Sequence, residues 1–470
     1  MVKLYKTDLC NNKMTFQECE LAIVRNAVDE AEAILAQKKM KMENVSKLVE
    51  TVEDFIIRKK LICYGGTAIN NILPKAAQFY NKELEIPDYD FYSPNALNDA
   101  KALADLYHKQ GYEEIEARAG MHVGTYKVFV NFIPVADITQ LPTKLFQNIY
   151  KDSISIAGIR YAPPNFLRMN MYNELSRPLG EVSRWEKVLK RLNLLNEHYP
   201  LDTKSSVCSS EELEQKLRDI SSAESKKIHE IVRVSFIEQG VVFFGAYATD
   251  LFSNYVESTP LKKLLTKIPD FDVLSENPER CAHIVVETLK DQGVQNVRRK
   301  RHEAIGDIIP VHYEIQVEAY SVAFIYEPIA CHSYNSVEVG NKEIFVATID
   351  TILNFYFAFY YVDKPYYDKD RLICLAKHLF ELEEKNRLEQ SGLLKRFSTR
   401  CIGNDKSIED LRAERSKKFR ELRHDRKAPE FEKYFLKYNP LYKHQVKKAK
   451  TRKKAKQKKA KKKTKVEASS

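Results

Sequence analysis

Long apolar runs are missing from this 470-residue chain. No segment approaches the roughly 20 consecutive apolar residues that a membrane-spanning helix needs. The first residues, Met1 to Asp8, contain no apolar stretch typical of a secretory signal. Hydrophobic residues at 44% and charged residues at 30% are ordinary for a globular protein. The composition therefore predicts a cytosolic protein that is not secreted and has no membrane partner.

Cysteine pairs of the CxxC type are also absent. The eight cysteines are scattered along the chain, and this spacing argues against both a zinc ribbon and a disulfide framework. We therefore expect reduced thiols with a mainly structural role.

The net charge of +11 is concentrated at one end of the chain. Residues 443–465 hold 14 of the 76 Lys and Arg residues and no acid, which leaves 62 basic against 65 acidic residues elsewhere. A nearly neutral body with a Lys-rich tail is predicted, and the tail has too few apolar residues to fold alone.

The first third of the chain alternates between helical and strand patterns. Apolar periodicity predicts helices over 15–41 and 45–60, and a short buried strand over 61–64 ends at two glycines. A helix from Thr67, a strand around Asp90, a helix over 95–110 and two strands between 123 and 139 follow in order.

Two aspartates two residues apart, Asp88 and Asp90, lie in the second of these strands. Strand alternation sends both carboxylates to one face. Mg²⁺ takes oxygen ligands, so such a pair can bridge two cations, and Asp137 on a later strand is our candidate for the third ligand. We predict that these three residues hold two Mg²⁺ or Mn²⁺ ions and are catalytic in nucleotidyl transfer.

The Gly65-Gly66-Thr67 turn precedes a predicted helix. Backbone without side chains lets phosphate oxygens approach exposed N–H groups at the positive end of the helix dipole. We therefore predict that Gly65, Gly66 and Thr67 bind the phosphate groups of a nucleotide substrate.

The same pattern returns about 180 residues later. Residues 86–95 align without gaps with residues 268–277 at an offset of 182, and residues 61–66 align with 241–246 at an offset of 180. Strand, loop, strand and helix in the same order indicate a duplication.

The second copy has lost parts of the pattern. Ala246 and Tyr247 replace the second glycine and the threonine, although Gly245, Asp270 and Asp272 remain. One alignment places Ala323 opposite Asp137 and another nominates Glu318. We favour loss of the third acid, and we predict a degenerate second site with a structural or RNA-positioning role.

These residues resemble the nucleotidyltransferase superfamily of DNA polymerase beta. More narrowly, residues 61–70, 86–95, Glu174 to Pro178 and Ser183 to Lys187 resemble the poly(A) polymerase catalytic subunit of giant and other large cytoplasmic DNA viruses. The resemblance implies template-independent addition of AMP from ATP to RNA 3′ ends. It also implies a homodimer or a separate processivity partner, and a location in the host cytoplasm or the virion.

Basic residues between the copies are candidates for contact with phosphate or RNA. Lys187 could bind the triphosphate of ATP, and the RNA candidates are Arg177, Arg184, Lys190 and Arg191, with Lys453, Lys454, Lys458 and Lys459 in the tail. A solvated helix face is the plainer interpretation of the first group. Trp185 and the aromatic residues at 355–361 could stack on bases, although core packing is the more ordinary role for the aromatic cluster.

The predicted fold class is α+β, with two tandem nucleotidyltransferase-like domains that each combine a mixed sheet with helices. The predicted segments are a catalytic domain at 1–145, a helical bridge at 146–205, a degenerate second domain at 206–345, a helical region at 346–442 and a disordered tail at 443–470. Two alternatives stay open: a terminal nucleotidyltransferase of other specificity (uridylyl, CCA-adding or oligoadenylate synthesis), and a non-catalytic RNA-binding scaffold.

Overall fold

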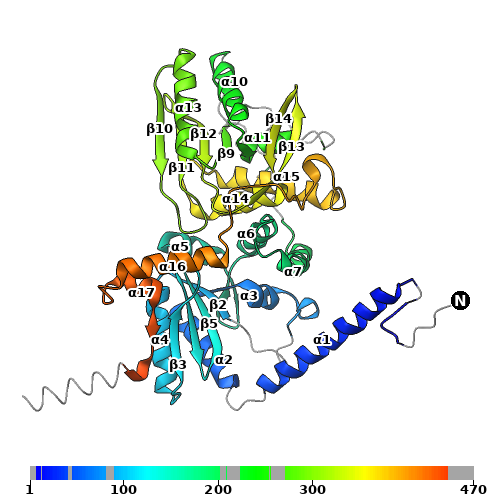
Figure 1. Cartoon of the computed structure of the whole chain (residues 1–470), viewed down its shortest axis with the longest axis vertical. Coiled ribbons are helices and arrows are strands. Elements are labelled where there is room, and N and C mark those ends of the chain that lie inside the picture. Colours follow the sequence, from blue (N-terminus) through cyan, green and yellow to red (C-terminus); the bar gives the residue numbers. More distant parts are fainter. Residues whose placement is uncertain are drawn as a thin grey trace, which may run out of the picture. The chain divides into compact units, whose positions relative to one another are not determined.

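The computed structural model describes residues 7–11, 13–40, 45–80, 89–201, 208, 223–252, 255 and 270–442. These residues form two compact units (Figure 1). The first contains the described residues up to Gln140, Ser155–Arg160 and those from Leu422 onward, and the second contains Leu141–Ile154 and the described residues of 161–421. The Lys-rich tail and Asp88 lie outside the described residues. Within the described part of the chain, no helix is long and apolar enough to cross a bilayer.

The first unit is built on an eight-stranded sheet with the order β16-β3-β4-β5-β2-β1-β7-β6. Its strands are β1 (Ile62–Tyr64), β2 (Tyr89–Ser93), β3 (Ile115–Ala119), β4 (Thr125–Val130), β5 (Ile133–Gln140), β6 (Ile154–Ile156), β7 (Ile159–Tyr161) and β16 (Lys437–Tyr438). Its helices are α1 (Phe16–Met40), α2 (Val45–Lys59), α3 (Gly65–Ile72), η1 (Lys75–Ala77), α4 (Ala96–Lys109) and α17 (Pro429–Phe435).

The core of this unit lies between the sheet and the helices α2 and α4. Tyr107 is fully buried and donates a hydrogen bond to the carbonyl of Leu48, which ties α4 to α2. Tyr89 and Phe91 on β2 are buried as the alternation predicted. The opposite face of β2 carries Asp90, so the packing of its neighbours fixes the side of the sheet on which that carboxylate lies.

The second unit contains another eight-stranded sheet, ordered β10-β11-β12-β9-β8-β14-β13-β15. The strands are β8 (Val242–Phe244), β9 (Phe271–Leu274), β10 (Val297–His302), β11 (His312–Val317), β12 (Tyr320–Tyr326), β13 (His332–Val339), β14 (Lys342–Ala347) and β15 (Cys401–Ile402). The helices are α5 (Thr143–Asp152), α6 (Pro164–Leu175), η2 (Val182–Arg184), α7 (Trp185–His198), α10 (Ala223–Glu238), α11 (Gly245–Phe252), α13 (Pro278–Asp291), α14 (Ile349–Val362), α15 (Lys369–Lys385), η4 (Gly392–Leu394) and α16 (Ile408–Leu422).

The two sheets share one topology. β3-β4-β5-β2-β1 in the first corresponds to β10-β11-β12-β9-β8 in the second. In each, the DxD strand pairs parallel with one neighbour and antiparallel with the other. The predicted α+β class with tandem related units is therefore confirmed, whereas the finer division into five segments remains a prediction.

The aromatic cluster at 355–361 packs in the core of the second unit. Phe355, Phe357, Phe359 and Tyr361 are buried on α14, and the ring of Phe355 lies 4.6 Å from that of Phe244 on β8. The core-packing interpretation holds for these four side chains. They are not available to stack on bases.

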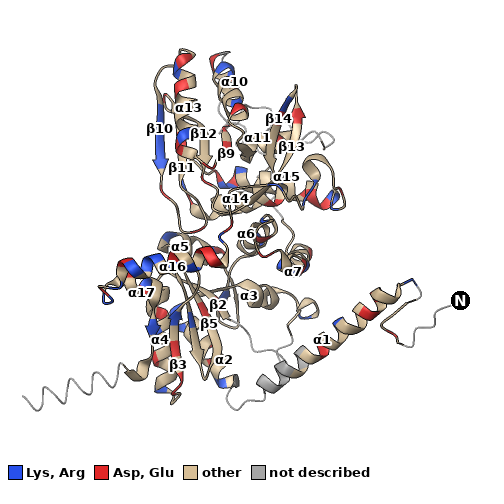
Figure 2. Ribbon diagram, in the orientation of Figure 1, with Lys and Arg blue, Asp and Glu red and all other residues tan. Residues whose placement is uncertain are grey.

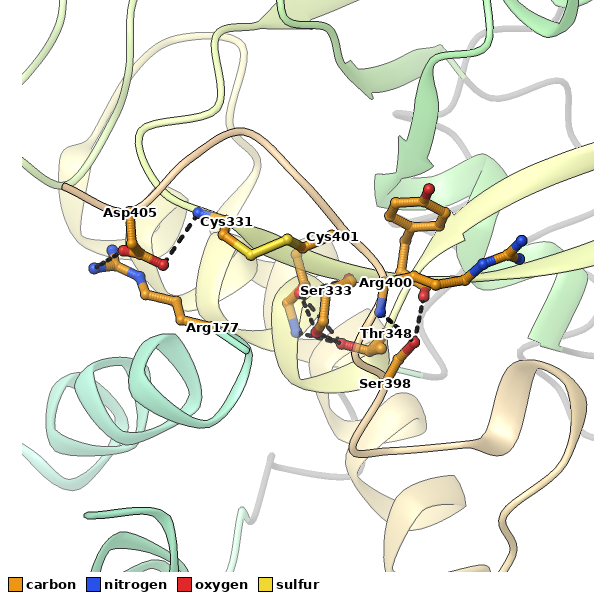
Figure 3. The surroundings of a disulfide bond; sticks show 10 residues. Arg177, Cys331, Ser333, Thr348, Ser398, Arg400, Cys401 and Asp405 are labelled. Carbon is orange, nitrogen blue, oxygen red and sulfur yellow. Dashed lines mark hydrogen bonds and ion pairs between the residues drawn. A yellow bond between two sulfur atoms is a disulfide. The ribbon is translucent and has the colours of Figure 1, made fainter. Parts of the chain in front are cut away.

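The expectation of reduced cysteines is wrong for three pairs. Disulfides link Cys10 with Cys19, Cys208 with Cys374, and Cys331 with Cys401. Two of these pairs are 166 and 70 residues apart in sequence, so folding, not spacing, brings the thiols together. Figure 3 shows the Cys331–Cys401 disulfide, which links the residue just before β13 to the first residue of β15. Cys63 and Cys281 are free and buried.

Candidate active site

The turn from β1 into α3 brings a glycine against a carboxylate. Gly65 has φ +73°, a conformation that side-chain-bearing residues rarely adopt, and a β-carbon there would lie 2.6 Å from Oδ2 of Asp90. Tyr64 precedes the helix and provides no side-chain cap for its amides. The beginning of α3 can therefore present backbone N–H groups to an anion beside Asp90.

The other two members of the predicted phosphate turn differ in exposure. Gly66 is partly accessible, whereas Thr67 is buried within α3. Because Thr67 is buried, its hydroxyl is less accessible to a phosphate group than the backbone N–H groups of the glycines. The assignment of both residues to the triphosphate remains a prediction.

Asp90 and Asp137 are direct neighbours across two parallel strands. The register of β2 and β5 pairs Asp90 with Asp137, and adjacent strands are about 4.8 Å apart. Both side chains are partly accessible on the same face of the sheet. The fold thus brings together two of the three predicted carboxylates, and the third, Asp88, falls outside the described residues.

Lys127 is a site residue that the sequence analysis missed. It is the cross-strand neighbour of Asp137 on β4 and forms an ion pair with that carboxylate. Its only sequence signal is its place in an alternating strand, between buried Tyr126 and Val128. The third predicted metal ligand is therefore held by a cation from the protein itself.

The carboxylates belong to a row of side chains that crosses the sheet. Successive strand registers place Tyr64, Asp90, Asp137, Lys127, Arg118 and Lys437 on one line from β1 to β16. The acidic centre is therefore followed by three cations on the adjoining strands. Such a gradient suits a reaction in which metal-bound and phosphate-bearing groups lie side by side.

Tyr64 on β1 is the cross-strand neighbour of Asp90 on the side away from Asp137. Its ring stacks on Tyr92 at 3.8 Å, and its hydroxyl lies 2.9 Å from Oγ1 of Thr139. Burial, together with Tyr92 and Asp90, raises the pKa of Tyr64 well above its usual value. The phenol therefore stays protonated and serves to position its neighbours.

The described residues include no group of three or more His, Cys, Asp or Glu side chains arranged to hold a metal ion. Asp90 and Asp137 nevertheless supply oxygen donors from adjacent register positions, and hard divalent cations prefer such donors. The donor set fits Mg²⁺ or Mn²⁺, with Asp88 as the expected additional ligand.

The corresponding row in the second unit has lost its third acid. The registers align Phe244, Asp272, Phe324, Glu314 and Lys300. Phe324 thus occupies the position of Asp137, which corrects both sequence alternatives, Ala323 and Glu318. The connection from β10 to β11, residues 303–311, is longer than the connection from β3 to β4, residues 120–124, and this explains why counting along the chain missed Phe324.

The residues that the second copy retains from the motif contact other residues of the second unit. Gly245 has φ +76°, and a β-carbon there would overlap the carboxylate of Asp272. Asp270 forms an ion pair of 3.6 Å with Arg371 on α15. Desolvation, reinforced by Asp270, raises the pKa of Asp272 well above its usual value, while Arg371 opposes the rise. The ion pair between Asp270 and Arg371 therefore links α15 to the residue that precedes β9.

Tyr247, which replaces the threonine of the first copy, faces the core. Its ring lies 5.0 Å from both Phe243 and Phe271. The Tyr247 hydroxyl is hydrogen-bonded to Arg233, so it does not take the place of the Thr67 hydroxyl. The second copy therefore lacks the phosphate turn as well as the third acid.

The basic candidates around α7 lie in the second unit, mostly with acidic partners. Arg177 lies 3.8 Å from Asp405, Arg184 lies 2.9 Å from Glu174, and Lys190 lies 2.8 Å from Glu186. Burial lowers the pKa of Arg177, and Asp405 counteracts part of that effect. Lys187 and Arg191 lie on the same helix. Their roles toward ATP and RNA remain predictions, as do those of the tail lysines, which lie outside the described residues.

Comparison with known proteins locates the similarity in the first copy. Residues 50–181 match the family described as poly(A) polymerase catalytic subunit. A protein of African swine fever virus (isolate Pig/Kenya/KEN-50/1950), described as a candidate poly(A) polymerase catalytic subunit, is 32% identical over 175 residues, which is 36% of this chain and 36% of that protein. An Acanthamoeba polyphaga mimivirus protein of the same description is 34% identical over 160 residues, covering 33% of this chain and 27% of its own length. The alignments thus span about a third of the length of these relatives.

A solved structure extends the similarity of fold to nearly the whole chain. The crystal structure of the Megavirus polyadenylate synthase aligns with a TM-score of 0.72 over 94% of this chain and 88% of that one, at 18% identity. The structural likeness confirms the fold, and the matched segment confirms the resemblance drawn from the sequence motifs.

Proposed function

With residues 50–181 matching the poly(A) polymerase catalytic-subunit family as the premise, we propose that this chain is a template-independent poly(A) polymerase. It adds AMP from ATP to RNA 3′ ends and releases pyrophosphate. The observation that carries the proposal is the register of Asp90 beside Asp137, next to the start of α3. These groups supply cation ligands and an anion-binding backbone within one compact unit.

Each part of the site has a separate task. The backbone at Gly65 and Gly66 binds the triphosphate, and Asp88, Asp90 and Asp137 hold two Mg²⁺ or Mn²⁺ ions. When bound, these ions activate the attacking 3′-hydroxyl and stabilise charge on the leaving pyrophosphate. Lys127 forms an ion pair with Asp137 and competes with metal for that carboxylate, and the stacked Tyr64 and Tyr92 hold the β1 side of the site in place.

Primer extension tests this function directly. The full chain is incubated with Mg²⁺ or Mn²⁺, an RNA primer and each nucleoside triphosphate separately, and the products are resolved by length. Extension with ATP alone supports the proposal. Extension with UTP, or short CCA additions, would instead favour the terminal transferases of other specificity.

A matched pair of variants distinguishes the enzyme from an RNA-binding scaffold. Asp90→Ala and Asp272→Ala change the same register position in the two sheets. Asp90→Ala should lower extension by at least about 100-fold, as expected for loss of a metal ligand, with RNA affinity largely retained. Asp272→Ala should leave the chemistry nearly unchanged. Equal activity of Asp90→Ala and the parent chain would refute the assigned site.

A homodimer belongs to the same proposal, and α1 offers a surface for it. Leu21, Val24, Val28 and Ile34 on α1 are each about half exposed, and exposed apolar residues at helical spacing commonly mark association surfaces. Sedimentation of the parent chain and of Val24→Asp would compare their masses. A processivity partner and location in the host cytoplasm or virion are further proposals, which rest on family resemblance alone.

A further inference from the structure

β10 is an exposed strand made almost entirely of cations. Its sequence places Arg298, Arg299, Lys300 and Arg301 in succession, and all four are exposed. Among the strands of the described residues, β10 is the first in its sheet and pairs with β11 alone. Figure 2 shows β10 coloured as basic residues along most of its length. The second unit therefore has a linear basic edge.

The four cations differ in their partners. Arg299 lies 3.8 Å from Glu279 on α13, and Arg301 pairs with Glu303. Arg298 and Lys300 alternate onto the opposite face, where neither forms an ion pair or side-chain hydrogen bond among the residues that the structure describes. Two positive charges thus remain uncompensated on this edge.

The cross-strand neighbour of Lys300 does not neutralise it. Register pairs Lys300 with Glu314, but the Glu314 carboxylate accepts hydrogen bonds from Gln316 and Ser321 and lies 2.8 Å from Nε2 of His302. This carboxylate is buried, whereas the Lys300 side chain is exposed. The ammonium group of Lys300 is therefore directed to solvent.

The fold itself does not require so basic a strand. β3 occupies the same place in the first sheet with only one cation, Arg118, and there β16 covers the outer edge. Within the described part of the chain no strand covers β10 in this way. A single lysine often suffices to prevent edge-to-edge pairing, so protection of the edge does not account for four successive cations.

We propose that β10 binds the phosphate backbone of single-stranded RNA through Arg298 and Lys300. The identity of the ligand rests on the proposed function, whose acceptor and product are RNA. Alternate strand residues are about 6.6 Å apart, similar to consecutive phosphates in an extended polynucleotide. Contact through phosphate alone carries no base preference, which suits a growing tail. β10 exposes no large apolar side chain of the kind that anchors protein partners.

RNA binding by the full chain tests this surface. Fluorescence anisotropy with labelled oligo(A) is measured between 50 and 200 mM salt for the parent and for Arg298→Gln/Lys300→Gln. Losing two single-strand phosphate contacts should weaken binding several-fold at low salt and reduce the slope of log affinity against log salt by about 1.4. Arg298→Lys/Lys300→Arg keeps both charges and should restore most of the slope.

A matched control removes two charges elsewhere in the same unit. Lys226 on α10 and Lys342 on β14 are exposed, and Lys226→Gln/Lys342→Gln should leave the slope unchanged. All variants are first compared by thermal unfolding to establish that they fold alike. An unchanged slope in the β10 variant, or an equal change in the control, overturns the inference.

Separate assays distinguish this inference from the proposed function. If the parent extends primers while the β10 variant binds RNA normally, the surface assignment alone fails. If β10 variants lose RNA affinity but the parent adds no AMP, the surface stands and the polymerase proposal fails. Binding of poly-glutamate but not RNA through β10 would assign the strand to an acidic protein partner and refute the RNA assignment.

Discussion

Gly65 and Asp90 are packed so closely that the carboxylate occupies the space of a missing side chain. A β-carbon on Gly65 would lie 2.6 Å from Oδ2 of Asp90. The same relationship recurs between Gly245 and Asp272 in the second unit. The glycine therefore serves both the turn into the helix and the placement of the aspartate.

The variant Gly65→Ala tests whether the close contact with Asp90 matters for activity beyond the backbone strain that any side chain would cause. Its φ of +73° makes any side chain costly, on the order of 1–2 kcal/mol, and the added methyl would also displace Asp90. We expect primer extension to fall by more than about 100-fold, because a 1 Å misplacement near the reaction alone costs about that much.

Gly111→Ala is the matched control for this variant. Gly111 also has a positive φ, +97°, but in the described part of the chain no atom lies within 4 Å of its added β-carbon. It should lose similar stability in urea unfolding while keeping its activity. Equal activity losses in both variants would show that strain, not contact with Asp90, is responsible.

Removing Lys127 should raise the affinity of the site for divalent metal ions. The Lys127–Asp137 pair is partly exposed, with side chains 39% and 15% accessible, so it is worth up to about 1 kcal/mol. Lys127→Gln leaves Asp137 free to bind cations. The Mn²⁺ concentration for half-maximal binding, measured by calorimetry, should fall by up to about fivefold. Lys127→Arg should behave like the parent, and an increased Mn²⁺ requirement in Lys127→Gln would contradict the expected competition.

Local sequence patterns predicted most of the first unit. The expected strand at 61–64 and helix at 95–110 correspond to β1 and α4, since hydrophobic periodicity and glycine stops act over a few residues. Alternation in β2 also identified the face that carries Asp90. The turn and its nearest carboxylate were therefore predictable from short segments.

Long-range register was not predictable in the same way. Lys127 meets Asp137 only because β4 pairs with β5 around an irregularity at Val128 and Phe129. A similar irregularity brings Glu314 opposite Phe324. One inserted residue reverses which side chains share a face, so counting from a motif fails beyond the first bulge.

His332 should make the second unit sensitive to acid. It is fully buried on β13, neither ring nitrogen has a hydrogen-bond partner among the residues that the structure describes, and its ring lies 5.3 Å from that of Phe355. Burial, with a smaller contribution from Arg177, lowers its pKa to about 3. The folded state thus excludes a proton that the unfolded chain binds near pH 6.5. The stability it contributes is present above pH 6.5 and is lost as pH falls toward 3.

His332→Leu tests that contribution. Between pH 6 and 4 the parent should lose up to about 1.4 kcal/mol more unfolding free energy per pH unit than the variant. Urea unfolding at several pH values measures the difference, and exposed His283 on α13 provides the control His283→Leu. Identical pH slopes for the parent and His332→Leu would show that His332 is not the group responsible.

The Cys331–Cys401 disulfide should stabilise the second unit. Figure 3 shows the bond beside two contacts of the segment 398–405. Ser398 donates a hydrogen bond to the carbonyl of Tyr334 at 2.7 Å, and the amide of Cys331 donates one to Asp405 at 3.3 Å. Closing a loop of 70 residues restricts the unfolded chain by about 4 kcal/mol in the chain-entropy model. Cys331→Ala/Cys401→Ala should therefore lower the unfolding free energy by up to that amount under non-reducing conditions.

Reductant should remove most of the difference between parent and variant, whereas the free thiol variant Cys281→Ala should differ from the parent equally with or without reductant. A parent whose unfolding is the same in both conditions, and the same as that of the double variant, would show that the bond contributes no stability.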